Sequence, residues 1–263
     1  MPELPEVETV VRTLAPHVAG QTIVDAQFYS RFVTPGNRSA LRRRVAGRTI
    51  RGIERRGKFI VITLDEGVLL IHLGMTGKLV IGAPRTAHTH AVFALEDAEL
   101  MYDDPRQFGR IEWSRELPER VTKLGPEPLE IAFNDFYDRL HTRRRQIKPL
   151  LLDQTFLRGL GNIYADEALF RARIHPQAIA AKIGKARGLD LYHAIAEVLR
   201  LAIEHGGSSI SDYVDAEGNR GYFQMQHQVY GREGQACPRC GRPIRRMVVA
   251  QRSAHFCSHC QRR

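Results

Sequence analysis

The chain of 263 residues lacks any apolar run close to the roughly 20 residues that a helix needs to cross a bilayer. It also lacks the basic and then apolar start of a secretory signal peptide, because its first residues are acidic. No internal repeat or low-complexity segment is present. These absences argue against membrane, secreted and repeat proteins. We expect a soluble intracellular protein, long enough for two domains or one large one.

Cysteine is also scarce, and all of it lies in one region. Two C-x2-C pairs are separated by sixteen residues, which is the spacing of a structural zinc site. A segment this short has too little core to fold without such help. Two disulfides are the alternative, which an intracellular setting disfavours. We therefore predict one structural Zn²⁺ held by Cys237, Cys240, Cys257 and Cys260. His255 and His259 could compete for the metal, but the cysteine spacing argues against them.

Acidic side chains are outnumbered: 29 Asp and Glu face 39 Lys and Arg, which gives a net charge of +10. Many of the arginines are clustered, for example at 42–44, 143–145 and 245–246. Basic clusters suit a polyanion, because neutralising its phosphates releases condensed counterions. The charge therefore favours nucleic acid as the partner, with a generic solvated basic surface as the alternative.

The hydrophobic pattern changes along the chain. Residues 3–19 carry apolar side chains at steps of three and four, which predicts a helix that ends at Gly20. Short, partly alternating runs between residues 21 and 113 predict antiparallel strands of a β-sandwich or barrel-like domain. A rigid linker at 125–128 precedes a region with helical periodicity. The fold class is therefore α+β with two domains, followed by the cysteine module.

The first nine residues carry an unusual set of reactive groups. If Met1 is removed, Pro2 becomes a free secondary amine beside the carboxylates of Glu3, Glu6 and Glu8. An α-amino group titrates at about pH 8, so part of it is neutral and nucleophilic near neutral pH. Its attack on a sugar carbon gives a cationic iminium, which is an electron sink for elimination. The alternative is a frayed, charged terminus with no chemical role.

Six motifs occur in an order that resembles one family. They are residues 2–9 (PELPEVET), 56–58 (RGK), 72–77 (HLGMTG), 104–109 (DPRQFG), 159–167 (GLGNIYADE) and the four-cysteine finger. Together they make the chain similar, over essentially its whole length, to bacterial formamidopyrimidine-DNA glycosylases. The resemblance implies an N-terminal β-sandwich with a leading helix (2–124), a helix-two-turn-helix DNA-binding domain (130–222) and a zinc finger (229–263).

The resemblance also implies catalytic roles. Pro2 is then the nucleophile, and Glu3 is the general acid and base at the sugar. Lys58 contacts phosphate beside the lesion and assists elimination, and Arg252 clamps phosphate and aids the last step. Glu6 orients water and the N-terminal turn. Considered without the family, Glu6 is a helix-dipole partner, Lys58 a solvated strand end and Arg252 an ordinary finger charge.

Further residues are expected to bind DNA. Met75, Arg106 and Phe108 match an intercalation set that fills the gap left by an extruded base; Met75 and Phe108 could otherwise be core residues. Asn162 opens a helix whose donors can hold a phosphate, although an ordinary N-cap is the alternative. Lys148, Arg143 and His90 match residues near the lesion or at phosphates. Solvated basic residues are the alternative for these three.

We accordingly expect a bacterial base-excision repair enzyme that flips out and removes oxidised purines, then cleaves the abasic site by β,δ-elimination. Its partner is damaged double-stranded DNA, and we expect a monomer in the cytoplasm, associated with the nucleoid and not with membranes. The alternatives are an endonuclease VIII-type enzyme for oxidised pyrimidines and a non-catalytic DNA-binding zinc-finger protein. Three residues, Gln107, Gln251 and His255, depart from the family pattern, so the DNA contacts around them are less well defined.

Overall fold

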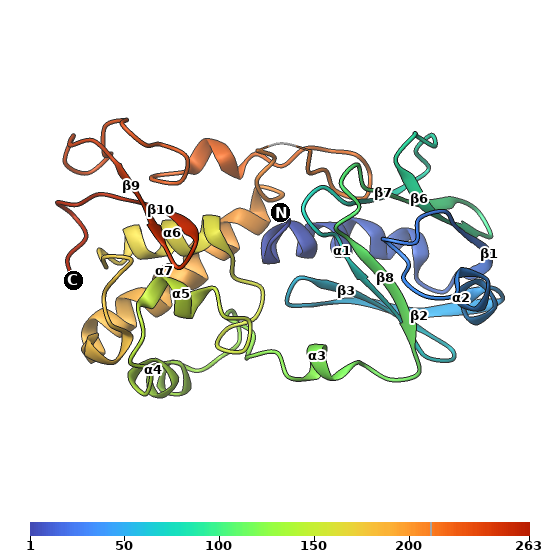
Figure 1. The fold of residues 1–263 in the computed structure, drawn as a ribbon, viewed down its shortest axis with the longest axis horizontal. Helices are drawn as coiled ribbons and strands as arrows, with labels where there is room; N and C mark the ends of the chain where they lie inside the picture. The colour runs from blue at the N-terminus through green and yellow to red at the C-terminus, as the bar shows by residue number, and fades with distance from the viewer. Residues whose placement is uncertain (211) are drawn as a thin grey trace. The chain divides into compact units, whose positions relative to one another are not determined.

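The computed structural model describes residues 1–210 and 212–263, and it divides into two compact units. Unit 1 comprises Met1–Lys123 and His205–Gln224, and unit 2 comprises Leu124–Glu204 and Met225–Arg263. Figure 1 shows the sheet with its leading helix in unit 1 and the helices with the terminal hairpin in unit 2. No helix within the described residues has the length and apolar composition needed to span a membrane.

Within its described residues, unit 1 contains three helices and eight strands. The helices are α1 (Leu4–Val18), α2 (Arg38–Val45) and α3 (Glu119–Thr122). The strands are β1 (Thr22–Phe28), β2 (Arg48–Arg56), β3 (Phe59–Leu64), β4 (Val68–His72), β5 (Lys78–Ile81), β6 (Thr89–Leu95), β7 (Glu99–Asp103) and β8 (Arg110–Ser114).

The strands form one antiparallel sheet in the order β5-β7-β6-β1-β2-β3-β4-β8. Strands β1 and β2 share only two residue pairs, Thr22 with Thr49 and Ile23 with Arg48. This short junction separates two halves of four strands each. Side chains from both halves and from α1, including Val10, Ile60 and Phe93, belong to one buried cluster. The two halves therefore enclose a common core, which confirms the predicted sheet-rich domain with a leading helix.

Unit 2 contains four helices, two single-turn 3-10 segments and one hairpin. These elements are α4 (Phe133–His141), α5 (Ile147–Leu151), α6 (Asn162–Arg171), η1 (Ala180–Lys182), α7 (Lys185–Glu204), η2 (Phe223–Gln226), which begins in unit 1, β9 (Arg245–Val249) and β10 (Arg252–Phe256). A small apolar cluster joins Phe170 of α6 to Val229, Ile244 and Cys257 of the finger region. The predicted helical region and cysteine module therefore share a core.

The domain limits predicted from the sequence remain a prediction, but the compact units divide the chain differently: the helical region and the finger share unit 2, and one segment belongs to unit 1. Residues 205–222, which we assigned to the helical domain, pack within unit 1. The physical reason is a set of hydrogen bonds to α1: the main-chain N–H of Ser208 and the hydroxyl of Tyr213 both donate to Glu6. The N–H of Ala216 donates to Thr13.

Candidate active site and metal centre

The start of α1 holds its glutamates in fixed positions. Glu3 is the N-cap residue and Glu6 lies three residues later, and the two form a capping box in which the Glu3 N–H donates to Glu6 Oε2 at 2.8 Å. Pro2 is buried, and Glu3 and Glu6 are only 3% and 2% exposed. The terminus is therefore anchored, and the frayed-tail alternative is wrong for this structure.

The second oxygen of Glu6 fastens a distant segment to this terminus. Glu6 Oε1 accepts the N–H of Ser208 at 2.7 Å. The preceding residue, Gly207, has φ of +81°, and a Cβ there would lie 2.9 Å from Glu6 Oε1. Only glycine combines this backbone conformation with so close an approach. Gly207 thus allows residues 205–224 to close against the first turn of α1.

Lys58 lies in the two-residue turn between β2 and β3, next to Gly57, whose φ is +62°. The turn is tied to α1 through Arg55, which donates to Glu8 Oε2 at 2.8 Å and to the carbonyl of Gly57 at 3.3 Å. Burial acts to raise the pKa of Glu8, but its bonds to Arg55 and Arg12 outweigh this and hold that pKa below its usual range. These bonds fix the turn that carries Lys58, just before β3, relative to α1.

His72, at the end of β4, is a further candidate site residue, which the sequence motifs did not single out. Burial, together with the positive charges of Lys58, Arg110 and Arg120, lowers the pKa of His72 to about 4. Its Nδ1 accepts a hydrogen bond from the main-chain N–H of Gly74, with 3.1 Å between the two nitrogens. The neutral ring therefore carries its proton on Nε2 and can donate there. The signal in the sequence was its place at the head of the motif that contains Met75.

Met75 and Phe108 are 41% and 52% exposed, on the loops after β4 and β7. Arg106 stacks on Phe108, with its Cζ 4.7 Å from the ring centroid. The loops touch directly, because a Cβ on Gly74 would lie 2.5 Å from the main chain of Phe108 and Gly109. The structure thus brings the three predicted intercalation residues onto one pair of adjoining loops, and the core alternative for Met75 and Phe108 is wrong.

One buried carboxylate holds these loops together. Asp104, with no exposed surface, accepts the Thr76 hydroxyl at 2.5 Å, the Gly109 N–H at 2.8 Å and the Arg106 N–H at 3.2 Å. His90 also belongs to this arrangement, since its Nε2 lies 3.0 Å from the carbonyl of Asp104. His90 therefore supports the loop bearing Arg106 in this structure.

Gln107 replaces a basic residue of the family pattern and has a structural role. Its φ of 55° is in the left-handed region, and its side-chain oxygen accepts the Ser30 hydroxyl at 2.6 Å. A glutamine can accept that hydrogen bond, whereas a lysine or arginine cannot. With glutamine at position 107, the loop lacks a cation but has a fixed turn between Arg106 and Phe108.

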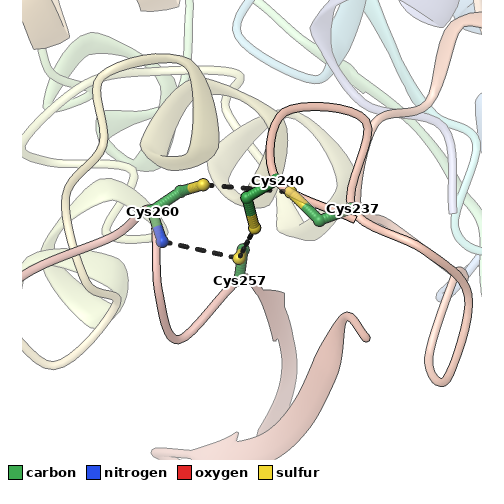
Figure 2. A group of neighbouring side chains, drawn as sticks. All are labelled: Cys237, Cys240, Cys257 and Cys260. Carbon is green, nitrogen blue, oxygen red and sulfur yellow. Dashed lines mark hydrogen bonds between the residues drawn. The ribbon is translucent and has the colours of Figure 1, made fainter. Parts of the chain in front are cut away.

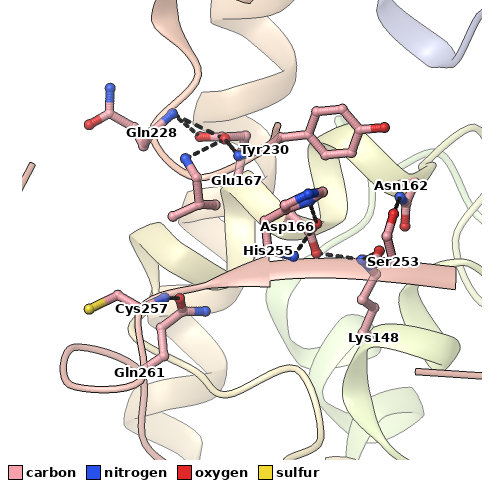
Figure 3. A network of polar contacts seen from close by, with 11 residues as sticks. Lys148, Asn162, Asp166, Glu167, Gln228, Tyr230, Ser253, His255, Cys257 and Gln261 are labelled. Carbon is pink, nitrogen blue, oxygen red and sulfur yellow. Dashed lines mark hydrogen bonds and ion pairs between the residues drawn. The ribbon is translucent and has the colours of Figure 1, made fainter. Parts of the chain in front are cut away.

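In unit 2, Lys148 is placed differently from our expectation. Its ammonium is fully buried and donates to Asp166 Oδ1 at 2.5 Å and to the main-chain carbonyl of Ser253. Figure 3 shows this network between α5, α6 and β10. Asp166 also accepts the N–H of His255 at 2.9 Å. The prediction that Lys148 itself contacts DNA is corrected, because two partners already enclose its charge.

The neighbouring Glu167 attaches the chain leading to the finger. Its carboxylate accepts the main-chain N–H groups of Gln228, Val229 and Tyr230 at distances between 2.8 and 3.1 Å (Figure 3). Burial nevertheless raises the pKa of Glu167. Together, Asp166 and Glu167 fix both the hairpin and the approach to it on α6.

The other predicted DNA contacts of unit 2 occupy exposed or terminal positions. Asn162 is the first residue of α6, after the N-cap Gly161, and its amide donates to Ser253 Oγ at 3.3 Å. The ordinary N-cap interpretation of Asn162 is therefore wrong. Arg252 is exposed at the start of β10, directly after a hairpin turn, and Arg143 is exposed beyond α4. The structure brings Asn162 and the residue after Arg252 together.

The four cysteines converge as a metal centre (Figure 2). All four Sγ atoms lie within 4.8 Å of one another, with Cys237 and Cys260 at 3.9 Å and Cys240 and Cys257 at 3.5 Å. Tetrahedral Zn–S bonds place sulfurs about 3.8 Å apart, whereas a disulfide requires about 2 Å. The set fits one structural zinc. His255 lies instead beside Asp166, with its Nδ1 at 3.3 Å from Oδ2.

Comparisons with known proteins agree with this geometry. Residues 1–111 match the formamidopyrimidine-DNA glycosylase N-terminal domain, residues 124–214 the H2TH domain of the same enzymes, and residues 234–263 a zinc finger found in FPG and IleRS. A formamidopyrimidine-DNA glycosylase of Solibacter usitatus is 58% identical over 265 residues, with each chain covered completely.

Solved structures show the same similarity. The MutM (Fpg) protein of Thermus thermophilus has a TM-score of 0.90 and 45% identity, over 99% of this chain and 98% of that one. Wild-type Lactococcus lactis Fpg in complex with DNA containing N7-benzyl-Fapy-dG has a TM-score of 0.90 and 38% identity, over the whole of both chains. The chain therefore belongs to the formamidopyrimidine-DNA glycosylase family and is a zinc-containing, DNA-binding glycosylase of base-excision repair.

Proposed function

We propose that this enzyme removes oxidised purines, chiefly 8-oxoguanine and formamidopyrimidines, from duplex DNA and cleaves the resulting abasic site. The observation that carries the proposal is the anchored terminus: buried Pro2 directly precedes a buried glutamate that caps α1. Removal of the exposed Met1 leaves a secondary amine held at a fixed position. The name of the relatives and the complex of the Lactococcus lactis protein with DNA containing N7-benzyl-Fapy-dG support the purine class.

The chemistry begins at the nitrogen of Pro2. This nitrogen attacks C1′ of the damaged nucleotide, the bond from C1′ to the base breaks, and the base leaves with a proton. Opening of the sugar gives an iminium between Pro2 and C1′. Loss of the 2′ proton then breaks the C3′–O bond and releases the 3′ phosphate, and a second elimination releases the 5′ phosphate. The permanent positive charge of the iminium is what makes the 2′ proton acidic.

Glu3 is the proton carrier in this scheme, because its carboxyl group belongs to the residue next to the amine. Glu6 has a positioning role. Its two oxygens are occupied by the N–H groups of Glu3 and Ser208, so it holds both the terminus and the segment 205–224 in place.

DNA is held by residues that each unit presents separately. In unit 1, Lys58 and the neutral His72 supply phosphate donors, and the loops bearing Met75, Arg106 and Phe108 fill the stack after base extrusion. In unit 2, Asn162, Arg143 and Arg252 supply phosphate contacts. Lys148 and His90 enter as positioning residues, the first beneath the hairpin and the second beneath the Arg106 loop. We also propose a monomer that works at the bacterial nucleoid.

The test is borohydride trapping of the iminium. The protein is incubated with duplex containing 8-oxoguanine opposite cytosine, reduced, and examined for a covalent adduct by gel and mass spectrometry. We expect an adduct on the N-terminal peptide that begins at Pro2. Retention of Met1 abolishes it, and Pro2→Gly keeps a partial reaction through its primary amine. Pro5→Ala, which changes the nearby proline in the first turn of α1, is the matched control and keeps full trapping.

The lesion class is tested with the same assay. Trapping on a duplex with oxidised thymine but not on the 8-oxoguanine duplex would identify an endonuclease VIII-type specificity. Full activity with Met1 retained would refute the role of Pro2. Phosphate binding has a separate measurement: with about 5–8 phosphate contacts, affinity for DNA falls steeply with salt concentration, and a flat response contradicts the assigned cations.

A further inference from the structure

Unit 2 contains a basic groove that none of the assigned DNA contacts use. Two cavities of about 730 and 470 Å³ share Arg187 and Arg263 in their walls, so they adjoin. We call them together the rear groove. Their walls contain six Lys and Arg side chains: Arg173, Lys182, Arg187, Arg239, Arg262 and Arg263. The acidic side chain that faces them is Asp190, and the metal-ligand thiols of Cys240 and Cys260 also line the first cavity, so positive charge remains in excess.

The walls of the rear groove are built from fixed main chain. Arg262 N–H donates to the carbonyl of Arg173, and its own carbonyl accepts the N–H of His175 and the guanidinium of Arg187. Arg239 lies over the ring of Phe170 with its Cζ 4.5 Å from the centroid and donates to the carbonyl of Phe170. The cations are therefore presented by a preorganised frame and not by a mobile tail.

The rear groove lies away from the residues that we assign to DNA in unit 2. Asn162 begins α6, whereas Arg173 follows its end, and ten helical residues span about 15 Å. Likewise Arg252 begins β10, whereas Cys260 follows its end, and five strand residues span about 13 Å. The hydrogen bond between Asn162 and Ser253 joins the first pair of ends. The groove is at the opposite ends of both elements.

We propose that the rear groove binds an extended, acidic polypeptide segment of a partner protein. Guanidinium groups match carboxylates in planar, paired hydrogen bonds, and a concave row of them suits a chain with alternating acidic side chains. Grooves for single-stranded nucleic acid add aromatic platforms on which bases stack. Among the described residues that form the walls of this groove, the ring-bearing side chain is His259 alone, which favours a peptide over a nucleic acid strand.

The test uses the zinc-loaded, full-length protein and a short fluorescein-labelled peptide of glutamate and glycine. Binding is measured by fluorescence anisotropy for the wild type and for the variant Arg173→Glu/Lys182→Glu/Arg262→Glu. These three residues are exposed, so the folded core and the cysteines are untouched. We expect the variant to bind the peptide at least about tenfold more weakly, as removal of charge complementarity predicts.

A matched control separates the groove from net charge. The variant Arg43→Glu/Arg51→Glu/Arg115→Glu makes the same change in charge at exposed positions of unit 1, and we expect its peptide affinity to stay within about twofold of the wild type. Absence of peptide binding, or equal losses in both variants, overturns the proposal. A larger loss of affinity for a short abasic duplex in the groove variant than in the control also overturns it, because the groove would then belong to the DNA surface.

Discussion

Each unit uses a buried glutamate on a helix to fasten a distant segment, but the two surroundings differ. In unit 1, Glu6 accepts main-chain N–H groups from Glu3 and Ser208, next to a second buried carboxyl group and the amine-bearing residue. In unit 2, Glu167 accepts three main-chain N–H groups, but the adjacent Asp166 is paired with the buried ammonium of Lys148.

This difference indicates a division of labour. Main-chain N–H groups fix Glu6 in place beside Pro2 and Glu3, where the chemistry that we propose takes place. A buried ion pair is held rigidly, and breaking it costs much free energy because each ion has lost its water. We therefore propose that the chemistry takes place in unit 1, and that the network beneath the finger hairpin in unit 2 has a positioning role.

The substitution with the largest expected effect on this comparison of the two units is Lys148→Met. The change leaves Asp166 buried without its cation, so we expect unit 2 to lose about 3–5 kcal/mol of unfolding free energy. The single tryptophan, Trp113, lies in unit 1, so its fluorescence follows that unit, whereas far-UV circular dichroism also follows the helices of unit 2. Denaturant titrations should therefore shift in dichroism far more than in fluorescence.

The control for this prediction is another ion pair of unit 2. Arg145 and Asp153 are 2.9 Å apart but partly exposed, so Arg145→Met should cost no more than about 1 kcal/mol. Similar losses in the two variants would show that the buried network has no special importance.

The second prediction concerns pH and unit 1. His72 has a pKa of about 4 when folded, against an ordinary value of 6.5, so the unfolded chain binds more protons between these values. The stabilisation is fully present above pH 6.5 and is lost as the pH falls toward 4, by about 3 kcal/mol from this group. His72→Gln should flatten this dependence in denaturant titrations followed by Trp113 fluorescence. An unchanged pH profile in the variant would show that His72 is not the group responsible.

Much of this arrangement could be read from local sequence. The spacing of the cysteines, the apolar stripe of α1 and the glycine-bounded loops around Met75 and Phe108 each depend on residues close in the chain. Their structures follow from turn geometry, periodicity and metal coordination, which act over short distances. The positions of these elements agree with the predictions for that reason.

The rest of the arrangement depends on hydrogen-bond partners far away in the chain, which no local sequence pattern predicts. In the sequence alone, Lys148 looks like a solvated basic residue. Its partners in the fold, Asp166 and Ser253, lie 18 and 105 positions away in the chain. Glu6 resembles an ordinary first-turn acid until Ser208, 202 positions away, donates to it. Buried polar groups must be satisfied, but which group satisfies them is decided by tertiary packing.

The smallest effect tests a feature that both units share, a glutamine in the left-handed region. Gln251 has φ of 63° in the turn before Arg252, where the family pattern has glycine, and Ala250 beside it has φ of 47°. Such conformations cost non-glycine residues about 1 kcal/mol each. Gln251→Gly should therefore stabilise unit 2 by about 1 kcal/mol in dichroism-monitored unfolding.

Gln107 in unit 1 is the matched position, with φ of 55°, but its side chain accepts the hydroxyl of Ser30. Gln107→Gly relieves similar strain and loses that hydrogen bond, worth about 1 kcal/mol, so its net effect should be close to zero. A gain at both positions would mean that the Ser30 contact contributes little. A loss at Gln251 would mean that its side chain, and not only its backbone, supports the turn before Arg252.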